Sequence, residues 1–444
     1  MKEQIQLSDH FSYRRLIRFV IPSVVMMIFT SIYGVVDGLF VSNFVGKTPF
    51  AAINLIYPLI MILGGFGFML GTGGTAIVAK TLGLGEKQRA NEYFTFIIIA
   101  TAVTGAVLAA LGIIFAEPVA RLLGAEGDML THAVTYARVV LIALPFFMLQ
   151  NTFQNFFITA EKPKLGLAVT VAAGITNIVL DALFVAVFKF GLVGAALATA
   201  MSQAVGGVVP VAYFLSKNTA AISFCRTRPY WRVLLQTCFN GSSELMSNIS
   251  ASIVTILYNY QLLRFAGEDG VAAYGAIMYV AFIFVAIFIG FVIGAGPIVS
   301  FHYGAGNTDE LKSLRKKSLC IVFTVGAIML FTALLLAVPL CRLFVGYDEG
   351  LYEITLRGFA IYAFSYLIAG FNIFGSSFFT ALNNGGVSAV ISFLRTLVFQ
   401  SAAVLILPEI FELDGVWFSI IAAELLSALV TTVFLIAKRK QYNY

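Results

Sequence analysis

Charged side chains are scarce in this sequence of 444 residues: Asp, Glu, Lys and Arg together make up 11%. Soluble globular domains contain about 25% charged residues, so the composition excludes an ordinary soluble domain. Cysteine, histidine and tryptophan are also rare, with four, three and two copies. The four cysteines have no metal-like spacing, no Ser-His-Asp, Cys-His or metal constellation can be assembled, and no ATP-binding P-loop is present. The sequence therefore does not predict an enzyme.

The sequence is rich in long apolar runs. The mean hydropathy is +0.93, and runs of about 20 residues recur, each long enough to cross about 30 Å of hydrocarbon as a helix. Alternating ten-residue strand patterns are absent, which argues against a β-barrel and leaves a helical bundle. We expect an all-α integral membrane protein with twelve transmembrane helices, at residues 15–42, 50–79, 93–116, 131–158, 165–188, 191–215, 233–263, 271–300, 318–340, 353–380, 387–408 and 414–437.

The net charge of +6 follows the membrane topology. With the N-terminus in the cytoplasm, 20 of the 28 Lys and Arg residues fall on the cytoplasmic side, 5 fall on the outer side and 3 fall within spans. Basic loops face the cytoplasm. We therefore expect a multi-pass protein of the plasma membrane with both termini cytoplasmic. The basic excess suits anionic lipids rather than nucleic acid.

The two halves of the sequence resemble each other at one constant offset, the shift that carries Gly46 onto Gly267. The same shift, without a gap between residues 44 and 194, matches glycines and prolines of other loop regions, among them Gly85 with Gly306 and Pro118 with Pro339. Six spans per half preserve orientation, so the repeat is parallel. We predict an N-lobe at 1–216, a cytoplasmic loop at 217–232 and a C-lobe at 233–444. Secondary transporters with such repeats bind substrate between or within the halves and rock one against the other.

Polar residues within the spans of the first half suggest a cation site. Asn177 and Asp181 lie one helical turn apart and share one helix face, and Asp37 lies on the first span. Two carboxylates with an amide and a hydroxyl form an all-oxygen set that can hold Na⁺ or share a proton. The repeat places Tyr258 and Ala402 at the positions of the two acids, so the second half lacks both. The alternative is that both aspartates lie at helix ends near headgroups.

The second half has other buried polar candidates, namely Glu244, Arg395 and Glu424. They are either a buried Arg–Glu pair that holds helices together or a second cation or substrate site. In the first span Pro22 removes a backbone hydrogen bond. Because it precedes Asp37 on the same helix, we interpret it as a hinge.

Three stretches resemble the MATE (multidrug and toxic compound extrusion) transporters: "YGVVDGLFVSNFVG" (33–46), "TNIVLDALFV" (176–185) and "GLVGAALATAMSQ" (191–203). The resemblance implies efflux of cationic, amphipathic drugs in exchange for H⁺ or Na⁺, and a bending proline that matches Pro22. It places the N-lobe cation site, with Na⁺ as one candidate ion, on Asp37, Asn177, Asp181 and Thr199, with Tyr136 nearby. Glu244 matches a helix-seven glutamate of one branch of the family. The acid that accompanies it on helix ten is missing here, which favours the N-lobe site.

The mechanism that follows is antiport by alternating access. A proton or Na⁺ on Asp37 and Asp181 favours helix bending and outward release of drug, whereas the empty site attracts a cationic drug. We expect an apolar and aromatic drug pocket that includes Tyr33, Met61, Phe153 and Gln154. No cofactor other than the coupling ion is expected, and a monomer suffices.

Two other functions fit the sequence less well. A lipid-linked saccharide or other amphiphile flippase of the same superfold would need a strongly cationic cavity, yet arginine within the spans is limited to Arg138, Arg357 and Arg395. A channel would conduct without coupling and would more often be a small subunit that oligomerises around a pore.

Overall fold

The computed structural model describes residues 5–444, apart from the side chains of Val35, Leu39, Ser42, Asn43 and Lys47. Within these residues the chain is helical and has no strand. The first half comprises α1 (Tyr13–Phe44), α2 (Lys47–Gly83), α3 (Lys87–Leu122), α4 (Gly127–Ile142), α5 (Leu144–Thr159), α6 (Pro163–Asp181), the π-helix η1 (Ala182–Val187) and α7 (Gly191–Leu215). The second half comprises α8 (Trp231–Gly304), α9 (Thr308–Val345), α10 (Glu349–Ala363), α11 (Tyr366–Ala381), α12 (Gly385–Phe393), the π-helix η2 (Leu394–Phe399), α13 (Gln400–Ile406), α14 (Pro408–Ala437) and α15 (Arg439–Tyr442).

These helices provide twelve membrane crossings. Among the described residues, nine helices are long and apolar enough to cross a membrane, and two bent pairs, α4 with α5 (55°) and α10 with α11 (48°), each supply one more. The helix α8 counts twice, because its 74 residues reverse direction at Gly267, where φ is 60°. The rings of Tyr258 and Tyr274, on either side of this turn, stack with centroids 5.1 Å apart. The prediction of a twelve-helix membrane protein is confirmed.

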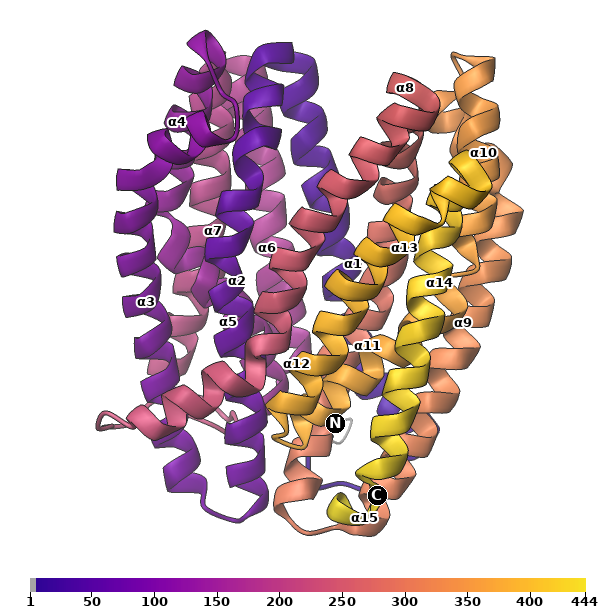
Figure 1. Ribbon diagram of the computed structural model, residues 1–444. Helices are drawn as coiled ribbons and strands as arrows, with labels where there is room; N and C mark the ends of the chain where they lie inside the picture. The colour runs from indigo at the N-terminus through magenta and orange to yellow at the C-terminus, as the bar shows by residue number, and fades with distance from the viewer. Residues whose placement is uncertain (1–4) are drawn as a thin grey trace.

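The backbone repeats the offset found in the sequence. Three pairs of residues with positive φ are related by this same shift: Gly46 with Gly267, Gly85 with Gly306, and Gly191 with Glu412. The bend at Ala143 in the first half and the bend at Phe364 in the second half are related by this shift as well. Figure 1 shows α1–α7 as one bundle and α8–α14 as a second beside it, with both chain ends at the same end of the molecule. We call these bundles the N-lobe and the C-lobe, and this end the terminus end.

The outward face of the bundle is apolar, and small residues fill the inside. On α3 the exposed side chains include Val103, Val107 and Leu111, whereas the buried ones include Gly105 and Ala109. Membrane helices associate through close packing of small residues, because lipid tails are as apolar as leucine. The apolar exposed stripe on α3 is therefore the face that lipid covers.

The lobes are tightly joined at the terminus end. A Cβ added to Gly83 of α2 would lie 2.0 Å from the Phe301 carbonyl oxygen, and one added to Gly304 of α8 would lie 2.1 Å from the Lys80 carbonyl oxygen. Gly83 and Gly304 are related by the repeat, so the contact is nearly two-fold symmetric. The bundles meet at this end and diverge toward the other (Figure 1).

The segment 216–230, between α7 and α8, is bound along α3. Its backbone amides at Ser223 and Cys225 donate to the side-chain oxygens of Asn91 (3.0 Å) and Thr95 (3.1 Å). The hydroxyl of Thr227 donates to the Glu92 carbonyl oxygen at 2.8 Å. The connection between the lobes is thus fixed to the N-lobe up to the start of α8.

The two tryptophans occupy contrasting places. Trp231 begins α8 and is 66% exposed, whereas Trp417 of α14 is 1% exposed. A Cβ at Gly358 of α10 would lie 2.7 Å from the Trp417 ring. Trp417 is therefore wedged between two helices of the C-lobe.

Candidate functional site

The predicted acidic pair forms in the N-lobe. Asp181 is the last residue of α6 and is fully buried, and Asn177 lies one turn earlier and is also buried. The carboxyl groups of Asp37 and Asp181 are neighbours, and Asn177 lies beside Asp37. Among the described residues, neither Asp181 oxygen nor Asp37 Oδ1 makes a hydrogen bond of normal geometry, and Asn177 is the amide donor next to the Asp37 carboxyl group. The chain therefore supplies little to compensate charge on this pair.

Local packing brings the two acids together. Gly174 lies one turn before Asn177, and a Cβ there would come 2.4 Å from the Phe29 ring and 3.0 Å from the Tyr33 ring of α1. Glycine thus allows α1 to approach α6 closely. The π-helix η1 begins directly after Asp181. Such π turns are rare and frequently mark functional sites.

Hydroxyl groups surround the pair. Tyr136 of α4 is buried, lies beside Thr199 of α7 and is close to both Asp37 and Asp181. The Thr199 hydroxyl is buried without a hydrogen-bond partner at normal distance. The structure therefore brings together all five residues predicted for the cation site.

Two further residues of this cluster were not predicted from the sequence. Tyr57 of α2 lies beside Asp37 and Tyr33, and it is 49% exposed although its neighbours in the cluster are buried or half-buried. Gln150 of α5 is buried, and its side chain lies against the Tyr33 hydroxyl. The sequence "LQN" at 149–151, two adjacent amides inside an apolar span, was an available signal for Gln150.

The residues predicted for the drug pocket do not form one group. Tyr33 belongs to the acidic cluster, and Met61 packs against an apolar cluster that contains Tyr136. Phe153 is fully buried in an aromatic core and stacks on Phe214, with centroids 5.8 Å apart. The packing of Phe153 is that of a core residue.

Gln154 and Glu244 have different surroundings. The Gln154 side chain donates to the Thr170 hydroxyl of α6 at 3.3 Å. Glu244 lies on α8 in the C-lobe and is half-buried. One turn further along α8, Asn248 lies close to Gly65 of α2. This part of α8 therefore faces the N-lobe.

The charged residues in the middle of the C-lobe form a closed ion pair. The Arg395 Nη2 and Nε atoms donate to Glu424 Oε1 at 2.7 and 3.0 Å, and Asn372 Nδ2 donates to Glu424 Oε2 at 2.6 Å. Both Glu424 and Asn372 are buried. Glu244 takes no part in this network. The geometry matches the first of the two interpretations, a pair that joins helices.

The oxygen set around Asp37 and Asp181 is the one that the sequence predicts for a coupling ion. Over residues 5–444, no group of three or more His, Cys, Asp and Glu residues is suited to hold a metal ion. A Na⁺ ion would therefore rely on the two carboxylates together with the oxygens of Asn177 and Thr199. Oxygen ligands of this kind suit hard cations.

Pro22 lies where α1 contacts the other lobe. The helix α1 continues through it from Tyr13 to Phe44. A Cβ at Gly290 of α8 would lie 2.7 Å from the carbonyl oxygen of Ser23. The predicted hinge residue thus lies in the contact between α1 and α8.

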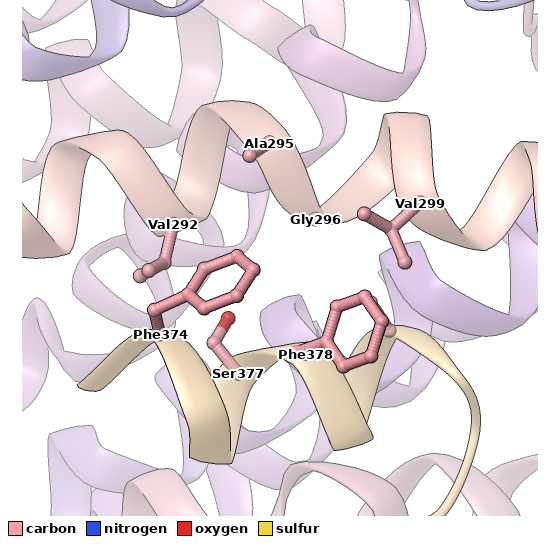
Figure 2. Close-up of a pocket in the computed structure, with 8 residues that line it drawn as sticks. Val292, Ala295, Gly296, Val299, Phe374, Ser377 and Phe378 are labelled. Carbon is pink, nitrogen blue, oxygen red and sulfur yellow. The ribbon is translucent and has the colours of Figure 1, made fainter. Parts of the chain in front are cut away.

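A small cavity in the C-lobe does not belong to this site. Figure 2 shows Phe374, Ser377 and Phe378 of α11 facing Val292 and Val299 of α8. The space is about 10 Å³. A drug-sized ligand needs roughly 300 Å³ or more, so this cavity is a packing defect.

Comparison with known proteins identifies the family. The sequence model of the MatE family matches residues 22–183 and 245–403, one stretch in each half. The chain belongs to the MatE family. This membership confirms the resemblance found in the sequence and places the protein among multi-pass membrane transporters, which are not enzymes.

Relatives of this MatE protein match nearly its whole length. The "Multidrug export protein MepA" of Staphylococcus saprophyticus is 23% identical over 427 residues, covering 94% of this chain and 92% of the relative. That of Staphylococcus haemolyticus is 22% identical and covers 97% and 94%. A crystal structure of MATE in complex with MaL6 matches with a TM-score of 0.94 at 22% identity, with 100% of both chains covered. An outward-facing multidrug resistance MATE family transporter matches with a TM-score of 0.93 at 22% identity, with 100% and 99% covered. These structures share its fold.

Proposed function

We propose that this protein is a secondary active multidrug efflux antiporter. It exports cationic, amphipathic compounds in exchange for H⁺ or Na⁺ by alternating access between its two lobes. The observation that carries the proposal is the Asp37–Asp181 pair, two neighbouring buried carboxyl groups with no basic side chain among their neighbours, beside the half-exposed Tyr57. The name of its relatives, multidrug export protein, agrees with this function.

The position of the pair supports alternating access. From the start of α1 at Tyr13, Asp37 is about 36 Å along the helix, so it lies far from the terminus end. The lobes are joined at the terminus end by the Gly83–Gly304 contact. The acids thus lie toward the end at which the bundles diverge, and the joined end must open to complete a transport cycle.

The acidic pair couples ion and drug because it cannot hold both. Two adjacent carboxylates repel each other, and a proton or Na⁺ between them removes the repulsion. Once the ion has left, the negative charge attracts a cationic drug, which the aromatic surfaces of Tyr33 and Tyr57 suit. Differential affinity in the two conformations sets the coupling.

The topology and assembly follow from the same evidence. The positive-inside rule puts the terminus end in the cytoplasm, so we assign the protein to the plasma membrane with the acids toward the outside. Lipid covers its apolar outer face. Both lobes belong to one chain, so a monomer suffices, and no cofactor other than the coupling ion is needed.

The flippase alternative is not supported by the arginines. Arg395 is paired with Glu424 and Arg357 with Asp414, while Arg138 is exposed. None of them is left as a free charge within the bundle. A cavity built for a diphosphate would need several unpaired cations.

The test is drug efflux from proteoliposomes driven by an imposed pH gradient or an imposed Na⁺ gradient. We expect the wild type to transport with one of the two gradients, and Asp37→Asn and Asp181→Asn to abolish that transport. Asp128→Asn, the same substitution at an exposed N-lobe position, is the matched control and should transport normally. Normal efflux by both site variants would refute the coupling site.

A further inference from the structure

Residues 438–444 fold back against the C-lobe at the terminus end. We call this stretch the tail, and it contains the short helix α15, which lies at that end of the molecule in Figure 1. Tyr444 is buried, its hydroxyl donates to the Leu435 carbonyl oxygen of α14 at 3.1 Å, and its ring meets the Phe378 ring edge-on at 5.0 Å. The tail therefore has a defined place on the C-lobe.

Two arginines meet where the tail lies against α9. The guanidinium carbon of Arg315 lies 5.1 Å from the centre of the Tyr444 ring, and Arg439 is close enough to Arg315 for the two positive charges to repel each other. Neither arginine forms an ion pair with an acid of residues 5–444. In the same part of the chain, the buried Arg315 Nε atom has no hydrogen-bond partner. The C-lobe thus brings two like charges together without an acid to balance them.

The N-lobe shows that the fold does not require charge at these positions. The repeat carries Arg315 onto Phe94. It carries the tail onto the start of the connecting segment, residues 216–230, with Asn218 in the place of Arg439. The packing there is apolar, because the Phe94 ring stacks on the Phe224 ring with centroids 5.0 Å apart. Both lobes therefore pack a segment against equivalent helices, and only the C-lobe places arginines at these two positions.

The arginines lie at the border of the face that lipid covers. On α14 the exposed side chains of Val433 and Ile436 form an apolar stripe, and Arg439 follows this stripe by three residues. On α9 the exposed Lys316 lies two turns before the exposed Phe323, on the same helix face. Cationic side chains near the ends of membrane helices reach the level of the lipid headgroups. The arginines are therefore within reach of a headgroup.

A phosphate group is the anion that suits this pair. Guanidinium groups bind phosphate oxygens through two parallel hydrogen bonds, and such charge-assisted bonds are stronger than neutral ones. Basic pockets between membrane helices bind anionic headgroups. The exposed Lys316 and Lys440 directly follow the two arginines in the sequence and add two further cations nearby. One bound phosphate would also offset the repulsion between Arg315 and Arg439.

We propose that Arg315 and Arg439, flanked by Lys316 and Lys440, form a binding site for the phosphate of an anionic phospholipid. The acyl chains of this lipid lie along the exposed apolar side chains of α9 and α14. Because the site joins α9 to the tail, the bound lipid fastens the tail to the C-lobe. Lipid binding does not depend on transport, so the proposal stands or falls separately from the proposed function.

Native mass spectrometry of the full chain, released from detergent micelles, tests the site. Phosphatidylglycerol is titrated, and the dissociation constant of the first bound lipid is measured. Arg315→Gln with Arg439→Gln should raise this constant about 25-fold, with roughly fivefold for each cation near the headgroup. Lys217→Gln with Arg226→Gln is the matched control, because it removes two exposed cations of the connecting segment, and it should leave the constant unchanged. An unchanged constant in the site variant, or equal weakening in the control, overturns the proposal.

A single exposed substitution keeps the test independent of folding. Arg439→Glu places a carboxylate beside Arg315, where it takes the position of the lipid phosphate, so binding of the first phosphatidylglycerol should be lost. Arg439 is exposed, and the unfolding temperature without lipid should equal that of the wild type. Arg226→Glu, the same charge reversal on the connecting segment, should bind the lipid normally. Normal binding by Arg439→Glu would refute the site.

The choice of probe identifies the source of the phosphate. Phosphatidylcholine carries the same phosphodiester without net charge and should bind more weakly than phosphatidylglycerol. Inorganic phosphate at the same concentration should not displace the lipid, because it has no acyl chains to cover the apolar side chains. Displacement by inorganic phosphate would reveal a general anion site and overturn the assignment to a lipid. Equal binding of the two lipids would show that the arginines do not select an anionic headgroup.

Discussion

The two lobes share one backbone plan and differ in how they treat buried charge. In the C-lobe the Glu424 carboxylate receives Arg395 and Asn372, and its network is complete. In the N-lobe the neighbour of the Asp181 carboxyl group is a second acid, Asp37, and neither Asp181 oxygen makes a hydrogen bond of normal geometry to the described residues. A buried charge with a full set of partners is fixed, whereas one without partners depends on what arrives from solution. We therefore interpret the C-lobe pair as structural and the N-lobe pair as the part used in transport.

The same contrast extends to repeat-related positions. The repeat relates Asn372 to Asn151 and Glu424 to Gln203. Asn372 donates to Glu424, but Asn151 Nδ2 and Gln203 Oε1 are both buried without partners. The two halves therefore share the helix arrangement but differ in the polar side chains at equivalent positions.

Breaking the C-lobe pair should have the largest effect on stability. Glu424→Leu leaves the partly buried Arg395 without its partner and should lower the free energy of unfolding by about 3 kcal/mol, the lower end of the range for breaking a buried pair. Denaturant unfolding in detergent micelles, followed by circular dichroism, measures it. Arg357→Met removes an exposed ion pair of the same lobe and should cost at most about 1 kcal/mol. If the two variants lost equal free energy of unfolding, the buried network would contribute no more to stability than the exposed ion pair.

Removing both charges should restore most of that stability. Arg395→Met with Glu424→Leu leaves no buried unpaired charge, so the double variant should recover at least about 2 kcal/mol relative to Glu424→Leu. It should also keep gradient-driven efflux. Loss of efflux in a stable double variant would show that the C-lobe pair takes part in transport. The interpretation of this pair as purely structural would then be wrong.

The glycine contact at the terminus end should respond equally from both lobes. Gly83→Ala and Gly304→Ala each place a methyl group about 2 Å from a carbonyl oxygen of the other lobe, an overpacking worth about 1–3 kcal/mol. Each should lengthen, by the same amount, the distance between spin labels on the exposed positions 88 in the first turn of α3 and 309 in the first turn of α9, because the terminus end opens. Gly275→Ala, where a Cβ meets nothing within 4 Å, is the control. Opposite shifts would refute the symmetry of the contact.

The smallest effect should come from groups that lack partners. Tyr258, the counterpart of Asp37, has a buried hydroxyl without a hydrogen bond. Tyr258→Phe should therefore leave the free energy of unfolding unchanged or raise it by up to about 1 kcal/mol. Asp181→Asn should also leave the free energy of unfolding unchanged or slightly raised, although it abolishes transport. A large loss of stability in Asp181→Asn would show that the aspartate has partners that hold the fold.

The sequence predicts the spans and the repeat well, because apolar length and loop glycines are local signals. The bends within the fourth and tenth spans were not predicted. Pro145, in the first turn of α5 after the bend at Ala143, was a usable signal. The matching bend at Phe364 has no proline beside it, so its cause is tertiary packing that a single sequence does not show.

The acidic site was predictable because charge within an apolar span is costly and therefore conspicuous. Tyr57 was not, since 18 tyrosines are spread along the chain and only the fold puts this one beside Asp37. Glu310 had an ordinary explanation as an acid in the first turn of α9, where the helix dipole favours negative charge. Its bonds to the Phe11 amide and to His10, in the segment before α1, join positions 299 and 300 residues apart, and no local pattern in the sequence indicates such a pairing.

The placement of the two tryptophans has an optical consequence. Trp417 is enclosed in the C-lobe, and Trp231 stands exposed where the connecting segment passes into α8. The fluorescence of Trp417 therefore depends on packing within the C-lobe, and that of Trp231 depends on the environment at the junction between the lobes. With Trp231→Phe, the remaining fluorescence follows unfolding of the C-lobe. With Trp417→Phe, it follows the environment at the start of α8 during turnover, without an attached dye.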